Sequence, residues 1–138
     1  MEHYLDNAAT TQVCPEAAEA AVKYMTERFG NPSSAHQAGR EARAALKKAR
    51  ADIAASIGAR PDELFFTAGG SEGDNWAIRS GAHLMRHKGK HIISSLTEHD
   101  AVLKTLSYLE ANGYEITRLF PGSDGAIHAG GGLNALRP

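Results

Sequence analysis

The chain has 138 residues, which is enough for one modest domain. Its formal net charge of −1 argues against the basic surface that nucleic-acid binding needs, and its single cysteine, Cys14, excludes an internal disulfide. The first residues lack the basic and apolar regions of a secretory signal, and no apolar run approaches the ~20 residues that cross a bilayer. We therefore expect a soluble, cytoplasmic protein with no nucleic-acid or membrane partner.

The first part of the chain predicts two helices. Pro15 suits a first helical position, apolar residues follow at spacings of three and four, and Gly30-Asn31-Pro32 ends the pattern. Ser33 or Ser34 can cap a second helix, which ends at Gly58. Its basic residues lie mostly off the apolar stripe, as on a solvated helix face, although such a run could also bind an anionic partner. They are Arg40, Arg43, Lys47, Lys48 and Arg50.

The rest of the chain alternates between strand and helix patterns. We expect strands over residues 63–67, 91–95 and 114–119, and helices over residues 71–88 and 100–112. This order favours an α/β layer architecture with a mostly parallel sheet. We expect residues 1–60 to form an N-terminal segment with two helices and residues 61–138 to begin an α/β domain. Three glycines near the end, Gly130 to Gly132, weaken a last helix there.

A glycine-rich turn between a predicted strand and a predicted helix carries the strongest local signal. In Phe66-Thr67-Ala68-Gly69-Gly70-Ser71-Glu72, backbone N–H groups and the Ser71 hydroxyl could hold a phosphate. The alternative is a tight turn with Ser71 as a plain helix cap. No Walker lysine follows and the G-x-G-x-x-G spacing is absent. Glu72 and Asp74 would repel an anion unless their carboxylates point away from it.

A second signal is His99, which follows the predicted strand over residues 91–95. Both turns would lie at the carboxyl ends of parallel strands, where ligands of open α/β sheets bind. An imidazole there could stack on a flat ring or move a proton, and the alternative is a helix-start histidine without a ligand. His83 and His87 share a helical face, but no H-E-x-x-H pattern exists, so we expect no metal site.

Four segments, in order and spacing, resemble cysteine desulfurases of the class V aminotransferase group, which are fold-type I enzymes that use pyridoxal 5'-phosphate (PLP). They cover nearly the whole chain up to about Gly125. The segments are Tyr4 to Thr11, Phe29 to Ser34 with His36 and Gly39, Phe66 to Asn75, and Thr97 to Leu103.

This resemblance implies a three-layer PLP-transferase large domain, of which residues 61–138 would be the incomplete start. Gly70 and Ser71 would hold the PLP phosphate, and His99 would stack on the pyridine ring. The family converts L-cysteine to L-alanine and an enzyme persulfide, and the sulfur passes to iron–sulfur cluster assembly or transfer-RNA thiolation. A homodimer and a sulfur-acceptor or scaffold protein are the implied partners.

The resemblance also implies what this chain lacks. The family's PLP-bearing lysine stands in a Ser-x-His-Lys setting, which none of the six lysines here shares, and Cys14 lies at the wrong end to accept sulfur. We therefore expect no catalytic residue here, and a truncated chain that is inactive alone. The alternatives are a non-catalytic dimerisation or regulatory fragment of the same fold, or another class V aminotransferase-type PLP enzyme.

Overall fold

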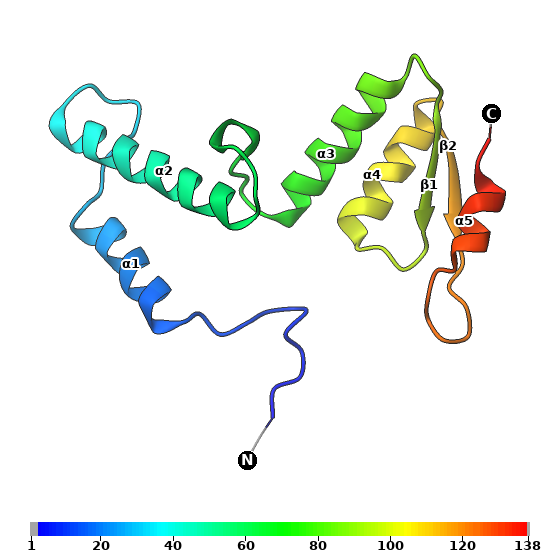
Figure 1. The fold of residues 1–138 in the computed structure, drawn as a ribbon, viewed down its shortest axis with the longest axis horizontal. Helices are drawn as coiled ribbons and strands as arrows, with labels where there is room; N and C mark the ends of the chain where they lie inside the picture. The colour runs from blue at the N-terminus through cyan, green and yellow to red at the C-terminus, as the bar shows by residue number, and fades with distance from the viewer. Residues whose placement is uncertain (1–2, 138) are drawn as a thin grey trace. The chain divides into compact units, whose positions relative to one another are not determined.

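The computed structural model describes residues 3–137 and divides into two compact units, residues 1–65 and residues 66–138 (Figure 1). Residues 1, 2 and 138, at the ends of the predicted domain ranges, lie outside the described residues. Among the described helices, none is long and apolar enough to span a membrane.

The first unit contains two α-helices, α1 (Pro15–Thr26) and α2 (Gln37–Ser56), and a short 3-10 helix, η1 (Pro61–Glu63). Pro15 is the first residue of α1, as predicted. The predicted serine cap of α2 is wrong, because Ser34 closes a turn by donating its N–H to the carbonyl of Asn31. His36 caps α2 instead, and its Nδ1 accepts the N–H of Gly39 at 3.3 Å.

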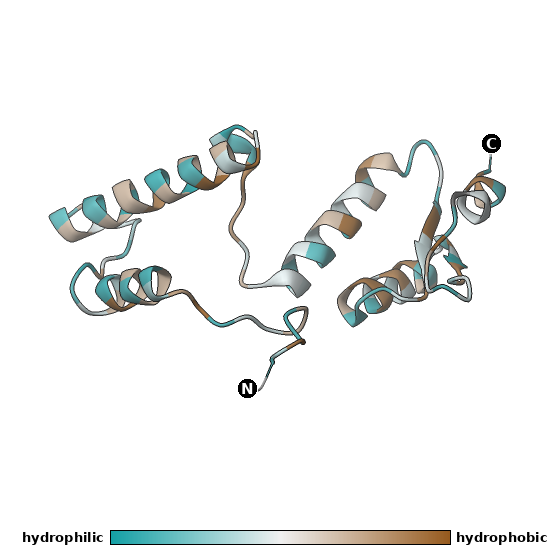
Figure 2. Ribbon diagram, turned by 60° about the horizontal axis from the view of Figure 1, so that its bottom comes forward, coloured by the Kyte–Doolittle hydropathy of each residue, from teal (hydrophilic) through white to brown (hydrophobic). Residues whose placement is uncertain are grey.

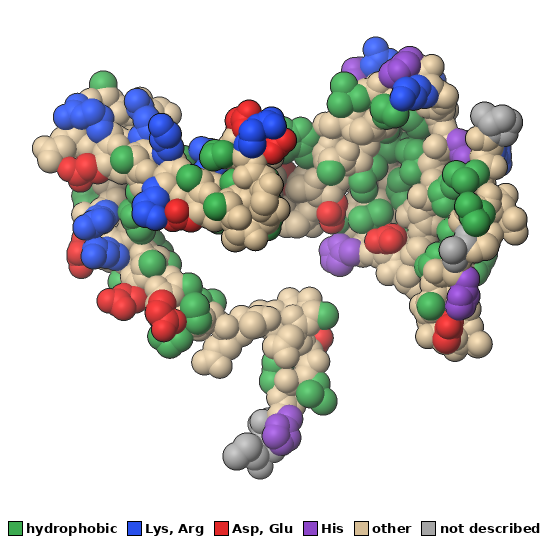
Figure 3. Space-filling view, viewed as in Figure 1, with side chains coloured by type: hydrophobic (Ala, Val, Ile, Leu, Met, Phe, Trp, Pro, Cys, Tyr) green, Lys and Arg blue, Asp and Glu red, His purple; other side chains and the backbone are tan. Residues whose placement is uncertain are grey.

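The loop before α2 packs closely against the backbone of the first turn of that helix, at Gly39. A Cβ on Gly39 would lie 2.4 Å from the carbonyl oxygen of Ser34 and 2.8 Å from that of Asn31, so only glycine fits this position. The Nε of Arg43 donates to the carbonyl of Pro32 at 2.7 Å. Basic side chains gather along α2, as Figure 3 shows.

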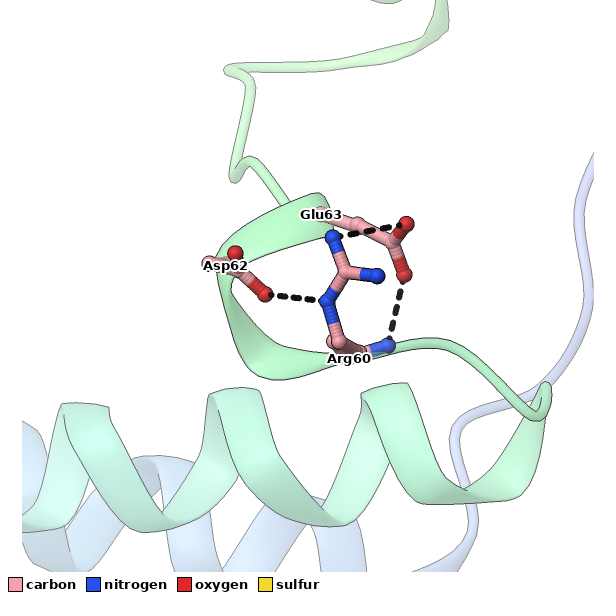
Figure 4. A network of polar contacts seen from close by, with 3 residues as sticks. All are labelled: Arg60, Asp62 and Glu63. Atoms are coloured by element: carbon pink, nitrogen blue, oxygen red, sulfur yellow. Dashed lines mark hydrogen bonds and ion pairs between the residues drawn. The ribbon is translucent and has the colours of Figure 1, made fainter.

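The predicted strand over residues 63–67 is wrong. Its first residue belongs to η1, where the Arg60 N–H donates to Glu63 Oε2 at 2.8 Å and the Arg60 Nε donates to Asp62 Oδ1 at 3.2 Å (Figure 4). Leu64 is extended, with φ −100° and ψ 127°, but residues 64–67 join no strand among the described residues. Extended backbone becomes a strand only when a neighbour accepts its ladder of hydrogen bonds, and a local apolar pattern cannot supply that neighbour.

The second unit is a small α/β arrangement. Its elements are α3 (Gly70–Met85), β1 (His91–Ser95), α4 (Asp100–Ala111), β2 (Glu115–Leu119) and α5 (Ala129–Ala135). β1 and β2 pair in parallel with His91 opposite Glu115 and Ser95 opposite Leu119. The helices α3 and α4 lie on one side of the two strands and α5 on the other (Figure 1). This layering and the parallel pairing confirm the predicted α/β fold class.

The buried residues of this unit come mainly from α4. Leu106 is 1% exposed, and Ala101 and Leu109 are also buried. Thr105 is buried too, and its hydroxyl donates to the carbonyl of Ala101 at 2.7 Å, so burial leaves no unpaired donor there. Figure 2 shows hydrophobic and hydrophilic residues alternating along the helices. This buried face fixes α4 against its neighbours and thereby fixes the start of the helix, where His99 lies.

Candidate functional site

The structure brings two of the predicted site residues into one groove. Ser71 at the start of α3 and His99 just before α4 line an open groove of about 400 Å³. Gly70, the first residue of α3, directly precedes Ser71. The rest of the lining comes from the same two helices: Asn75, Arg79, Asp100, Ala101, Lys104, Thr105 and Tyr108.

The start of α3 leaves room for an anion. Gly69 is the cap residue and carries no side chain, so Ser71 is not the helix cap that the alternative interpretation required. In a first helical turn the N–H groups have no carbonyl partner within the helix. Apart from adjoining residues and the backbone of α3 itself, no atom of the described residues lies within 4 Å of the position that a Cβ on Gly69 or Gly70 would take. The N–H groups of Gly70 and Ser71 can therefore donate to a ligand.

The two carboxylates beside this helix start do not line the groove. Glu72 Oε2 accepts the backbone N–H of Ala68, and neither Glu72 nor Asp74 is among the lining residues. The amide of Asn75 donates to the carbonyl of Ser71 at 2.9 Å. Because the carboxylates of Glu72 and Asp74 lie outside the groove lining, they repel an anion in the groove less than lining carboxylates would.

His99 has a structural role as well as a place in the groove. It is the cap of α4, and its Nδ1 accepts the N–H of Ala101 at 3.1 Å. Because Nδ1 accepts, the neutral ring carries its proton on Nε2. The hydrogen bond also fixes the direction of the imidazole. His99 is therefore the helix-start residue that one interpretation expected, and it also lines the groove.

Two cations that the sequence reasoning missed also line the groove. The guanidinium of Arg79 lies over the ring of Tyr108, 4.4 Å from its centroid, and Lys104 Nζ lies 2.8 Å from Asp100 Oδ2. The hydrogen bond from Lys104 lowers the pKa of Asp100, and the same bond raises the pKa of Lys104, so both are ionised at neutral pH. With two cations against one carboxylate, the groove favours an anion.

A spacing signal could have found these residues. Ser71, Asn75 and Arg79 follow one another at intervals of four, and so do Asp100, Lys104 and Tyr108. Each set therefore lies on one helix face. The missing information was that α3 and α4 pack side by side, which the chain's order of elements alone does not state.

The histidines considered for a metal make other contacts. Arg86 Nη1 lies 2.6 Å from His83 Nε2, and His87 Nδ1 lies 2.9 Å from the carbonyl of Leu84. Within residues 3–137, no three His, Cys, Asp or Glu side chains come together as a possible metal site. Cys14 is exposed in the first unit.

Comparison with known proteins agrees with the predicted resemblance. Residues 3–137 match the aminotransferase class-V family. The chain is 47% identical over 134 residues to cysteine desulfurase IscS of Methanosarcina thermophila, covering 97% of this chain and 33% of the relative. It is 51% identical over 125 residues to cysteine desulfurase IscS of Neisseria meningitidis, covering 90% of this chain and 31% of that protein. The chain thus spans about a third of the length of these curated relatives.

Solved structures agree with this assignment. A NifS-like protein superposes with a TM-score of 0.86 at 35% identity, over 95% of this chain and 36% of the other. A structure described as SspA in complex with cysteine superposes with a TM-score of 0.84 at 39% identity, over 95% of this chain and 38% of the other. The chain therefore belongs to the aminotransferase class-V family, and the predicted resemblance to cysteine desulfurases is confirmed.

Proposed function

We propose that this chain forms the part of a PLP-dependent cysteine desulfurase that holds the phosphate and one face of the ring of the cofactor. Gly70 and Ser71 would bind the phosphate and His99 would cover the ring. The observation that carries the proposal is that Ser71 and His99 line one groove. L-Cysteine as the substrate is supported by the cysteine desulfurase relatives and by the cysteine complex of SspA.

The donor set at the start of α3 suits a phosphate. The Ser71 hydroxyl and the first N–H groups of the helix are hydrogen-bond donors, and the helix dipole favours negative charge there. The open space beside Gly69 and Gly70 allows close approach. Arg79 and Lys104 add positive charge along the same groove. These four properties fit a phosphate group better than a neutral or cationic ligand.

The imidazole of His99 suits a flat heterocycle. Its bond to the Ala101 N–H holds the ring in one orientation before a ligand arrives, which lowers the ordering cost of stacking. The proton on Nε2 can be donated to a bound polar group. When bound, PLP supplies an electron sink for the substrate's α-carbon. The same proposal, for the whole enzyme, includes a sulfur-acceptor protein and a homodimeric assembly. It also includes the use of the sulfur in iron–sulfur clusters or transfer RNA.

Titration of the chain with PLP, followed by cofactor absorbance, tests the assignment. Ser71→Ala removes a hydrogen bond to a charged group and should weaken PLP binding at least tenfold, from about 1.5–3 kcal/mol for such a bond. Ser71→Thr keeps the hydroxyl and should bind as the wild type does.

His99→Asn separates the two roles of His99. Asparagine is a strong helix cap, so α4 should keep its stability, whereas the stacking surface is lost. We expect PLP affinity to be weaker by a factor of about 2 to 13, from about 0.5–1.5 kcal/mol for a ring contact. Wild-type affinity in both Ser71→Ala and His99→Asn would refute the proposed site.

A further inference from the structure

The turn that leads into α3 is intrinsically loose. Gly69 and Gly70 are adjacent, and glycine loses more backbone freedom than other residues when it is fixed in one conformation. Gly69 also offers no side chain to cap the helix. A ligand that binds the N–H groups of this turn would therefore have to order the turn as it binds, unless other residues already hold it.

Side chains from both sides hold this turn. The Thr67 hydroxyl donates to the carbonyl of Gly69 at 3.2 Å, and the Gly73 N–H donates to the same carbonyl at 3.1 Å. Glu72 spans the turn: it belongs to the first turn of α3, and its Oε2 accepts the N–H of Ala68 on the other side of the glycines. Glu72 thus connects the first turn of α3 to the residue that precedes the two glycines.

The helix dipole favours a carboxylate such as that of Glu72 in the first turn of α3, but the charge also has a cost. A carboxylate next to Ser71 repels a phosphate bound there, and an uncharged residue would avoid that cost. The carboxylate of Asp74, two residues further along α3, forms no hydrogen bond or ion pair among the described residues, whereas that of Glu72 accepts the N–H of Ala68. The hydrogen bond to Ala68 gives Glu72 a function that offsets its charge.

We propose that Glu72 is a positioning residue for cofactor binding: by holding the N–H of Ala68, it orders the two-glycine turn so that the N–H groups of Gly70 and Ser71 are set for the phosphate before it arrives. This inference rests on the proposed function, which supplies the ligand. It adds that a residue outside the groove lining sets the affinity for the phosphate group of PLP, and not for the ring.

The test compares binding of PLP with binding of pyridoxal, which lacks the phosphate, to the whole chain. Glu72→Ala should weaken PLP about fivefold, the factor that corresponds to about 1 kcal/mol for a lost hydrogen bond, and leave pyridoxal unchanged. Glu72→Asp keeps the charge but is too short to reach Ala68 in the same way, so it should weaken PLP by a similar factor. Glu72→Gln keeps the acceptor and should bind PLP at least as tightly as the wild type.

Asp74→Asn is the matched control, because it removes a carboxylate from the same helical turn without removing a hydrogen bond. It should bind PLP at least as tightly as the wild type. Wild-type PLP affinity in Glu72→Ala or Glu72→Asp, while Ser71→Ala weakens binding, would overturn the role of Glu72 and leave the proposed function standing. Equal losses of PLP and pyridoxal affinity in Glu72→Ala would also overturn it. So would a PLP affinity of Glu72→Gln as weak as that of Glu72→Ala. If neither Ser71→Ala nor His99→Asn weakens PLP binding, the proposed function itself fails.

Discussion

The two units of the chain are held together in different ways. In the first unit, the buried residues of the described helices are Gly39 and Ala54, and local ties such as the His36 cap and the Arg60 network fix the backbone. In the second unit, α4 packs a buried stripe that includes Leu106 and Leu109. The first unit is therefore held mainly by close backbone contacts and hydrogen bonds, and the second mainly by burial of apolar side chains.

The difference follows from topology. A parallel strand pair requires a crossover, and the crossover helix α4 buries its apolar face as it returns, so this unit builds a core from consecutive elements. Two helices joined by a loop have no such requirement. Both units leave large apolar side chains exposed, which is typical of faces that contact other structure, and in the first unit they lie mainly on or next to the two helices. They include Val22, Met25, Phe29, Ile53 and Ile57.

The sharpest test of this contrast truncates one leucine in each unit, a buried one in the second and an exposed one in the first. Leu106→Ala should lower the free energy of unfolding of the second unit by about 2–5 kcal/mol, because it leaves a cavity at a side chain that is 1% exposed. Urea denaturation followed by Trp76 fluorescence measures this, since the only tryptophan lies in α3. Leu46→Ala, at a side chain 38% exposed in α2, is the control. An equal loss for Leu46→Ala would contradict the contrast.

A pair of glycine substitutions tests whether the close backbone contact at Gly39 stabilises the first unit. Gly39→Ala should destabilise α2 by about 1–3 kcal/mol, because the new methyl group overlaps the carbonyl of Ser34. Gly81 lies in the middle of α3, and among the described residues only its own helix backbone and chain neighbours come near the new methyl group, so Gly81→Ala should stabilise the helix by about 1 kcal/mol. Amide hydrogen exchange in α2 and α3 measures both changes in helix stability. Slower exchange of α2 in Gly39→Ala would show that the close approach is not tight.

The smallest expected effect concerns pH. Lys104 lowers the pKa of Asp100 below its ordinary value of 3.8, so the folded unit binds fewer protons than the unfolded chain in this range. The contribution of this pair to stability is therefore present above about pH 3.8 and is lost as the pH falls through the lowered folded value. Thermal unfolding of the second unit between pH 6 and pH 2 should show a shallower acid loss in Asp100→Asn.

The matched control for the pH experiment is Asp52→Asn in the first unit. Asp52 pairs with Lys48 at the same helical spacing as Asp100 with Lys104, so the substitution removes a comparable surface pair. It should leave the acid unfolding of the second unit unchanged. An identical change in both variants would mean that the acid loss does not depend on the Asp100 pair.

Local signals were enough where neighbouring residues decide the structure. The first residue of α1, both ends of β1 and the start of α4 were predicted because proline geometry, a short apolar run and the helical spacing of leucines act within a few residues. The turn at Gly69-Gly70 and the position of His99 after β1 were also predicted, since adjacent glycines favour a turn and a short apolar run favours a strand. The reason given for bringing them together was wrong, because no strand of the described chain precedes the glycine turn.

Tertiary structure alone decided the rest. Residues 64–67 have a strand-like sequence but join no sheet in the described chain, because a strand depends on a partner that lies elsewhere in sequence. The groove exists because α3 and α4 pack side by side, which brings Arg79 to Tyr108 and Ser71 into one groove with His99. Residue order fixes which face each helix presents, and only packing between distant segments fixes which faces meet.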